Sequence, residues 1–165
     1  MRDAAPQTIY LDDYKVSPFL IKKTDLVFDL GEDSTRVTAS LNIARNPDSD
    51  QQDGPLILHG SEGLDLQSMH IDGQLISTGD YSRDSDSLTI SNVPDSCVVT
   101  TEVLIKPQLN TTMKGLYRSR TMYCTQCEAE GFREITYYLD RPDVMSEFTT
   151  KVIADKDTYP VLLSN

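Results

Sequence analysis

Ten consecutive residues, from Cys124 to Arg133, hold the densest group of side chains in this sequence that could do chemistry. They include the amide of Gln126, the carboxylates of Glu128 and Glu130, and one guanidinium. If the segment is extended, the amide and both carboxylates project from the same side, because side chains alternate along a strand. Such a surface suits a protonated amine, which forms charge-assisted hydrogen bonds worth roughly 1.5–3 kcal/mol each. The alternative is a solvated acidic loop, since exposed glutamates are common and rarely functional.

The same segment carries a Cys-x-x-Cys pair, Cys124 and Cys127, at a spacing found in redox and zinc motifs. A structural zinc site needs two further ligands, and Cys97 with His59 or His70 provides them only if the fold brings them together. A thioredoxin-like motif needs a strand–helix–strand context that this sequence lacks. Three cysteines are also an odd number, so we expect free thiols in a reducing compartment.

Complete catalytic motifs are missing from the 165 residues. The sequence has no His-Glu-x-x-His, no glycine-rich phosphate loop and no Gly-x-Ser-x-Gly elbow. We therefore expect this chain to contain no catalytic residues and to bind no metal by itself.

Charge excludes two classes of partner. Fifteen Lys and Arg against 26 Asp and Glu give a net charge of -11, which repels nucleic acid backbones and anionic membrane surfaces. No stretch approaches the roughly 18 apolar residues of a membrane span, and the first residues lack the apolar core of a signal peptide. We expect a cytoplasmic protein that binds neither nucleic acid nor membrane.

The elements that position the acidic segment are predicted to be strands. Val37, Ala39, Leu41 and Ile43 alternate with polar residues, as does the run around Leu26. Gly31 lies between the two runs, so we interpret residues 19–45 as one long hairpin.

Further strands follow along the chain, with an exposed loop over residues 46–54. The Asp72-Gly73 pair favours a two-residue hairpin turn. One short helix is predicted after Pro142, whose apolar neighbours are spaced to cover one face. The other predicted strands are residues 55–58, 68–71, 74–76, 87–90, 98–105, 148–154 and 161–163.

This pattern predicts a single all-β domain over residues 1–165, mainly antiparallel, with at most one short helix. A sandwich, a barrel and a large curved sheet all fit this pattern. The sequence stops directly after a predicted strand, which we interpret as the cut end of a larger protein.

Several stretches resemble one known family closely. They are Gly115-Leu116-Tyr117, residues 125–133 and 135–143, then 148–151, 154–156, 159–160 and 162–165, with Tyr14, residues 23–26 and Phe28 near the amino end. On these residues the chain is similar to the amino-terminal domain of the bacterial aminopeptidase N family of zinc metallopeptidases (alanyl aminopeptidase type, gluzincins). The likeness covers essentially the whole chain.

The resemblance implies a curved, saddle-like β domain that leans on a thermolysin-like zinc domain in a four-domain enzyme. In this family, the glutamate of Gln-Cys-Glu-Ala-Glu binds the free α-amino group of the peptide substrate. The glutamine of that motif lines the pocket for the first side chain. These roles fall on Glu128 and Gln126, while Glu130 is a secondary candidate with a structural or electrostatic role. The family also implies a cis peptide between Glu128 and Ala129.

The resemblance further implies that zinc, the attacking water and the general base belong to a catalytic domain absent from this chain. The fragment is then expected to be inactive alone, and its partners are the amino terminus of a peptide and the missing catalytic domain. The rival hypothesis is a noncatalytic β-sandwich module whose exposed edges bind another protein. A His-Glu-x-x-His motif in the downstream reading frame would favour the peptidase.

Overall fold

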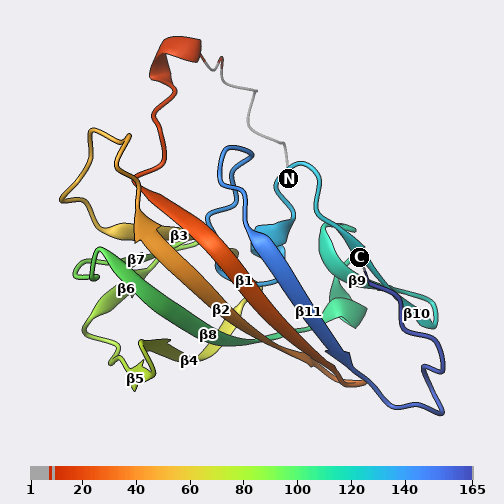
Figure 1. The fold of residues 1–165 in the computed structure, drawn as a ribbon. Helices are drawn as coiled ribbons and strands as arrows, with labels where there is room; N and C mark the ends of the chain where they lie inside the picture. The colour runs from red at the N-terminus through yellow and green to blue at the C-terminus, as the bar shows by residue number, and fades with distance from the viewer. Residues whose placement is uncertain (1–7, 9, 165) are drawn as a thin grey trace.

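The computed structural model describes residue 8 and residues 10–164, and within them the chain forms strands and single turns of 3₁₀ helix (Figure 1). The elements are η1 (Leu11–Asp13), β1 (Phe19–Leu30), β2 (Thr35–Arg45), β3 (Leu56–His59), β4 (Asp65–Ile71), β5 (Gln74–Leu75), β6 (Tyr81–Arg83), β7 (Ser87–Ile90), β8 (Ser96–Ile105), η2 (Pro107–Leu109), β9 (Gly115–Ser119), β10 (Met122–Gln126), η3 (Phe132–Glu134) and β11 (Glu147–Ile153). The predicted all-β class is confirmed. No helix in this described part is long and apolar enough to cross a membrane.

Six strands form the main sheet, in the order β11-β1-β2-β8-β4-β5. β1 and β2 pair antiparallel through their whole length, which confirms the predicted hairpin over residues 19–45. β11 lies along the other edge of β1 and runs parallel to it. In Figure 1 the four strands β11, β1, β2 and β8 lie side by side as long twisted ribbons.

The core lies where the alternation predicts it. The four apolar residues of β2, from Val37 to Ile43, are fully buried, and Val99 and Val103 of β8 pair with two of them. A three-stranded sheet, in the order β3-β7-β6, adds Leu58 and Leu88, which are also fully buried. Both sheets contribute to one hydrophobic cluster, as the sheets of a sandwich do. Each fully buried large side chain stabilises the fold by roughly 1.5–3 kcal/mol.

The Asp72-Gly73 turn also follows the prediction. Asp72 has a φ of 50° and Gly73 a φ of 78°, the two positive values that a type I′ turn requires. The turn joins β4 to β5 in antiparallel register. The aspartate carboxylate also accepts a hydrogen bond of 2.8 Å from the backbone N–H of Val98.

The predicted helix after Pro142 is wrong. Pro142 and Asp143 form a turn, after which Val144 is buried and Met145 is 86% exposed. The turn forms because the guanidinium of Arg141 donates two hydrogen bonds, of 2.9 and 2.8 Å, to the carboxylate two residues later. That local contact replaces the backbone ladder of a helix.

The predicted strand over residues 161–163 is also wrong, since the segment is irregular and pairs with no described strand. Its apolar side chains are largely exposed. The loop over residues 46–54 lies at the surface as predicted, but two of its polar side chains are buried. Asn46 donates a 2.9 Å hydrogen bond to the carbonyl of Ser17, and Ser49 lies beside it, so this loop is fastened to the core.

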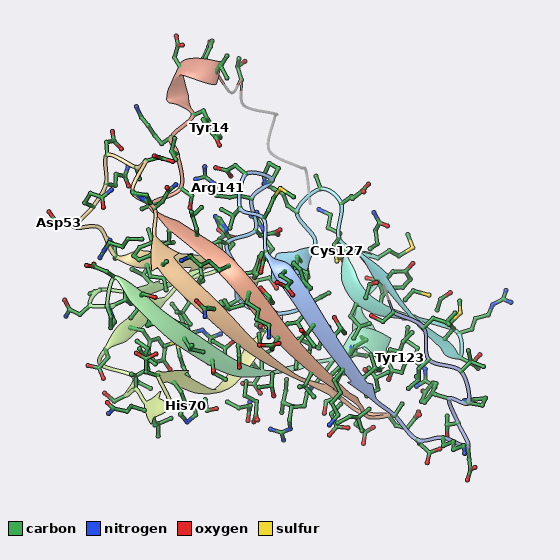
Figure 2. The ribbon with its side chains drawn as sticks, viewed as in Figure 1. Tyr14, Asp53, His70, Tyr123, Cys127 and Arg141 are labelled. Carbon is green, nitrogen blue, oxygen red and sulfur yellow. The ribbon has the colours of Figure 1, made fainter. Side chains whose placement is uncertain are left out.

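The segment before β1 is held against the turn before β11 (Figure 2). Tyr14 donates a 2.5 Å hydrogen bond to Asp143, and Arg141 lies over the Tyr14 ring and donates to the carbonyl of Lys15 at 2.6 Å. Hydrogen bonds from Arg141 are the main cause that lowers the pKa of Asp143 from 3.8 to about 2. The charged carboxylate therefore joins two segments far apart in the sequence.

This contact predicts a pH dependence of folding. Because the folded pKa of Asp143 is depressed, its contribution is complete above the ordinary value of 3.8 and is lost as the pH falls toward about 2. Asp143→Asn should therefore lower the free energy of unfolding at pH 5 and lower it less at pH 2.5, as measured by urea titration. Asp50→Asn, at an exposed carboxylate without a hydrogen bond or ion pair among the described residues, is the control. A deficit in Asp143→Asn that stays constant between the two pH values would contradict the assignment.

Candidate functional site

The acidic segment lies in a turn at the end of a β-hairpin. β9 and β10 pair antiparallel, with Gln126 opposite Gly115, and the chain then reverses before η3. The N–H of Gly131 donates a 2.7 Å hydrogen bond to the carbonyl of Cys127 and closes this reversal. We call residues 127–131 the acidic turn. The peptide between Glu128 and Ala129 is cis, as the resemblance implied.

The extended conformation that would align these side chains holds only for residues 124–126 of the segment, which end β10. Gln126 ends β10, whereas Glu128 and Glu130 lie in the turn, so alternation does not align the three side chains. The physical reason is the close approach of Gly131 to the strand end. A Cβ at Gly131 would lie 2.6 Å from the carbonyl oxygen of Gln126 and 2.9 Å from the Cα of Cys127. The chain folds back on itself here because this glycine leaves the space for it.

The three predicted site residues have different partners. The side-chain N–H of Gln126 donates a long hydrogen bond, 3.4 Å, to the backbone carbonyl of Glu128, which leaves the amide oxygen available as an acceptor. Glu130 lies 3.3 Å from a guanidinium nitrogen of Arg133. Glu128 is exposed, and its carboxylate makes no hydrogen bond or ion pair with the residues that the structure describes. Of the two carboxylates, only Glu128 therefore keeps its full capacity for an external cation.

An ion pair beneath the turn fixes its position. Arg133 donates from its backbone N–H and from its Nε to one oxygen of Asp140, at 3.1 and 2.9 Å, and from Nη2 to the Asp140 carbonyl at 3.0 Å. The side chain of Asp140 is only 11% exposed, so water screens this ion pair less than it screens a pair at the surface. Three donors on one partner leave the guanidinium little freedom to move.

The pair continues to a histidine of β3. The backbone N–H of Asp140 donates to Nδ1 of His59 at 3.1 Å, and His59 forms a bridge with Tyr138. Burial, followed by the nearby charge of Arg133, lowers the pKa of His59. The imidazole is therefore neutral at physiological pH, with Nδ1 as the acceptor. The His59 side chain thus accepts a backbone hydrogen bond. The sequence did not indicate this role, because the contact joins residues far apart in the chain.

Aromatic packing adds a second support. The ring of Phe132 lies edge-on to Tyr138, with centroids 4.7 Å apart, and 5.8 Å from Phe148. Phe148 belongs to β11, so the cluster joins η3 to the main sheet. Edge-to-face pairs of this kind contribute roughly 0.5–1.5 kcal/mol beyond their buried area. The acidic turn is thus exposed to solvent, while η3, which follows it, is packed against the main sheet.

The Cys-x-x-Cys pair does not join a metal-binding cluster. Over residue 8 and residues 10–164, no group of three or more His, Cys, Asp or Glu side chains could hold a metal ion. Cys124, Cys127 and the buried Cys97 are free thiols. Burial raises the pKa of both Cys97 and Cys127, which keeps these thiols protonated and unsuited to metal ligation. The side chains around this pair therefore do not fit a zinc site.

The close approach at Gly131 yields a prediction. Gly131→Ala places a methyl group against backbone atoms that cannot rotate away, so it should lower the free energy of unfolding by roughly 1–3 kcal/mol. Gly79→Ala is the control, because an added Cβ there meets nothing within 4 Å, and its effect should stay within about 0.5 kcal/mol. Urea unfolding of both variants measures this. Equal stabilities would show that the acidic turn does not depend on the missing side chain.

Comparison with known proteins shows which family this chain is similar to. The Peptidase M1 N-terminal domain model matches residues 21–165. Aminopeptidase N of Caulobacter vibrioides is 48% identical over 165 residues, which are 100% of this chain and 18% of that protein. The chain thus spans about 18% of the length of this relative.

Solved structures agree. Aminopeptidase A of Legionella pneumophila, crystallised with aspartic acid, has a TM-score of 0.85 and 33% identity, covering 94% of this chain and 18% of that one. An M1 zinc metallopeptidase of Deinococcus radiodurans bound to a Tyr-Ser-Ala substrate shares the fold, with a TM-score of 0.65 and 15% identity over 84% of this chain and 33% of that one. The match over residues 21–165 decides the family: the chain belongs to the peptidase M1 N-terminal domain family.

Proposed function

We propose that this domain holds the free α-amino group of a peptide substrate in a zinc aminopeptidase, with Glu128 as the carboxylate that receives the ammonium. The observation that carries the proposal is the state of this side chain. It is an exposed carboxylate without a described partner, and it stands on a turn fixed from below by the Arg133–Asp140 pair. A turn held in place before the ligand arrives loses less entropy on binding.

The neighbouring side chains support this assignment. Gln126 presents its amide oxygen two residues away, so it lines the position next to the ammonium and contacts the first side chain of the peptide. Glu130 pairs with Arg133 and so helps to orient the turn, which makes it a positioning group. The net charge of -11 attracts a cationic amino terminus from solution.

A fixed ammonium site explains removal of one residue at a time. When the amino group is held at Glu128, the first peptide bond lies at a set distance from this domain and later bonds lie farther away. The domain thus contributes selectivity for a free amino terminus. We assign bond cleavage and zinc to parts of the protein outside this chain, which spans about 18% of the length of its relative.

One prediction of this proposal concerns the chain alone. Purified residues 1–165 should retain no stoichiometric zinc after dialysis and should not hydrolyse alanyl chromogenic substrates, since the described part provides no set of metal ligands. Metal analysis by mass spectrometry and a sensitive absorbance assay measure the two properties. One zinc per chain would contradict the assignment, as would turnover that survives controls for host peptidases.

Another prediction of this proposal concerns Glu128 in the full-length protein. Glu128→Ala should lower kcat/KM for free peptides by about 10- to 150-fold, the equivalent of roughly 1.5–3 kcal/mol for a charge-assisted contact. Glu128→Gln should lose less, because the amide still accepts a hydrogen bond. Glu62→Ala removes another exposed carboxylate without a described partner and controls for the change in net charge.

Acylated substrates sharpen this test. An acylated amino terminus offers no ammonium, so wild type and Glu128→Ala should both process it slowly and at similar rates. The proposal fails if Glu128→Ala retains a nearly normal kcat/KM on free peptides. It fails equally if the mutant loses as much activity on acylated peptides as on free ones, because the carboxylate would then act on something other than the ammonium.

A further inference from the structure

The hairpin that carries the acidic turn stands apart from both larger sheets. β9 and β10 form a two-stranded sheet of their own and share no ladder with any other described strand. A two-stranded hairpin alone is marginally stable in water. Its position must therefore be fixed by side chains, and the supports beneath the acidic turn act at only one of its ends.

A cleft lies between the hairpin and the main sheet along much of its length. It has a volume of about 340 Å³ and is bounded by Phe28 and Leu30 of β1, Val152 of β11, residues 122–125 of β10 and the segment 158–164. Close packing normally fixes one element against another. Leu116 of β9 is buried in the core near the acidic turn, but the cleft weakens the packing farther along, so the far end of the hairpin needs a further constraint.

Polar contacts to the turn between β1 and β2 supply it. Arg118 of β9 donates to Oε2 of Glu32 at 2.9 Å, and Tyr123 of β10 donates to the carbonyl of Gly31 at 2.9 Å. The segment after β11 joins the same carboxylate, since Tyr159 donates to Oε1 of Glu32 at 2.9 Å. Both oxygens of Glu32 are thus occupied, each by a residue from a different part of the chain.

The aromatic rings and charges hold this cluster together. The rings of Tyr123, labelled in Figure 2, and Tyr159 are tilted with centroids 5.4 Å apart, and the Arg118 guanidinium lies 5.7 Å from the Tyr123 ring centre. The hydrogen bond from Tyr159, followed by that from Arg118, lowers the pKa of Glu32. Burial and the hydrogen bond to Glu32 raise the pKa of Tyr159 to about 12. The acceptor stays charged and the donors stay protonated throughout the neutral range.

We propose that Glu32 is a positioning residue for substrate binding: it fixes the β9–β10 hairpin through Arg118, and the segment after β11 through Tyr159, so that Gln126 and the acidic turn stay in place. Tyr123 and Gln126 lie on the same strand, so a displacement at one end of β10 is carried along the strand to the other. The inference rests on the proposed function for its effect on substrate, while the link between hairpin and turn is testable without it.

Hydrogen exchange on this chain tests the link. Glu32→Ala should speed exchange of the amides in residues 115–126 by about tenfold, while amides of β1, β2 and β8 stay unchanged, because only a local opening becomes easier. Glu32→Gln keeps an acceptor for Tyr159 and should show a smaller increase. Asp33→Ala removes an adjacent exposed carboxylate that makes no described hydrogen bond or ion pair, and should match wild type. Unchanged exchange in Glu32→Ala overturns the proposal, and so does an equal increase in Asp33→Ala.

Kinetics of the full-length protein test the consequence. Glu32→Ala should raise KM for free peptides about three- to tenfold with kcat within twofold, and Glu32→Gln should restore most of the affinity. If Glu128→Ala impairs free peptides while Glu32→Ala loosens the hairpin without raising KM, the positioning role is overturned and the proposed function stands. If Glu128→Ala has no effect either, the proposed function fails with it, and the exchange data still report whether Glu32 holds the hairpin.

Discussion

The pairing of β1 on both of its edges governs where the acidic turn lies. β2 pairs with it antiparallel, and β11 pairs with it in parallel over residues 23–29. β8 also runs parallel to β1, because it is antiparallel to β2. A chain that leaves β8 and returns as β11 must cross back over the length of the sheet, since parallel strands need a long connection. Residues 106–146 are that connection, and they contain η2, the hairpin and the acidic turn.

Three arginines of this connection pair with acidic side chains other than Glu128. Arg133 is held by Asp140 and Glu130, Arg118 by Glu32, and Arg141 by Asp143. These three guanidinium groups are therefore engaged with other acids, and none of the three neutralises Glu128. The excess of acidic residues leaves several carboxylates without a described partner, and Glu128 is the one that lies on the acidic turn.

Sequence patterns predicted the elements whose burial is regular. The alternation in β2 was sufficient because one face is fully buried and a shift of one residue would expose it. The hairpin β9–β10 escaped prediction because most of its side chains are partly or fully exposed and its strands pair only with each other. Pro142 and its apolar neighbours suggested a helix, but the salt bridge between Arg141 and Asp143 stabilises a turn there instead.

The site residues divide in the same way. Gln126, Glu128 and Glu130 were proposed as site residues from their types and their resemblance to a family motif. Their placement was not predicted, because it depends on the close approach of Gly131 to the end of β10. The hydrogen bonds that join Arg133 to Asp140 and Asp140 to His59 had no signal in the sequence. Nothing in the spacing of these residues shows that β3 lies close to them in the fold.

The edges of the main sheet determine how this domain behaves in concentrated solution. One edge, β5, is only two residues long, whereas the other, β11, is seven residues long and exposes about half of Phe148 and much of Ile153. A long unpaired strand is a template for pairing with another copy, and a lysine in such a strand, here Lys151, opposes it. The net charge of -11 keeps copies apart at low salt, and salt screens that repulsion. Aggregation of the isolated domain should therefore begin at β11 and increase with ionic strength.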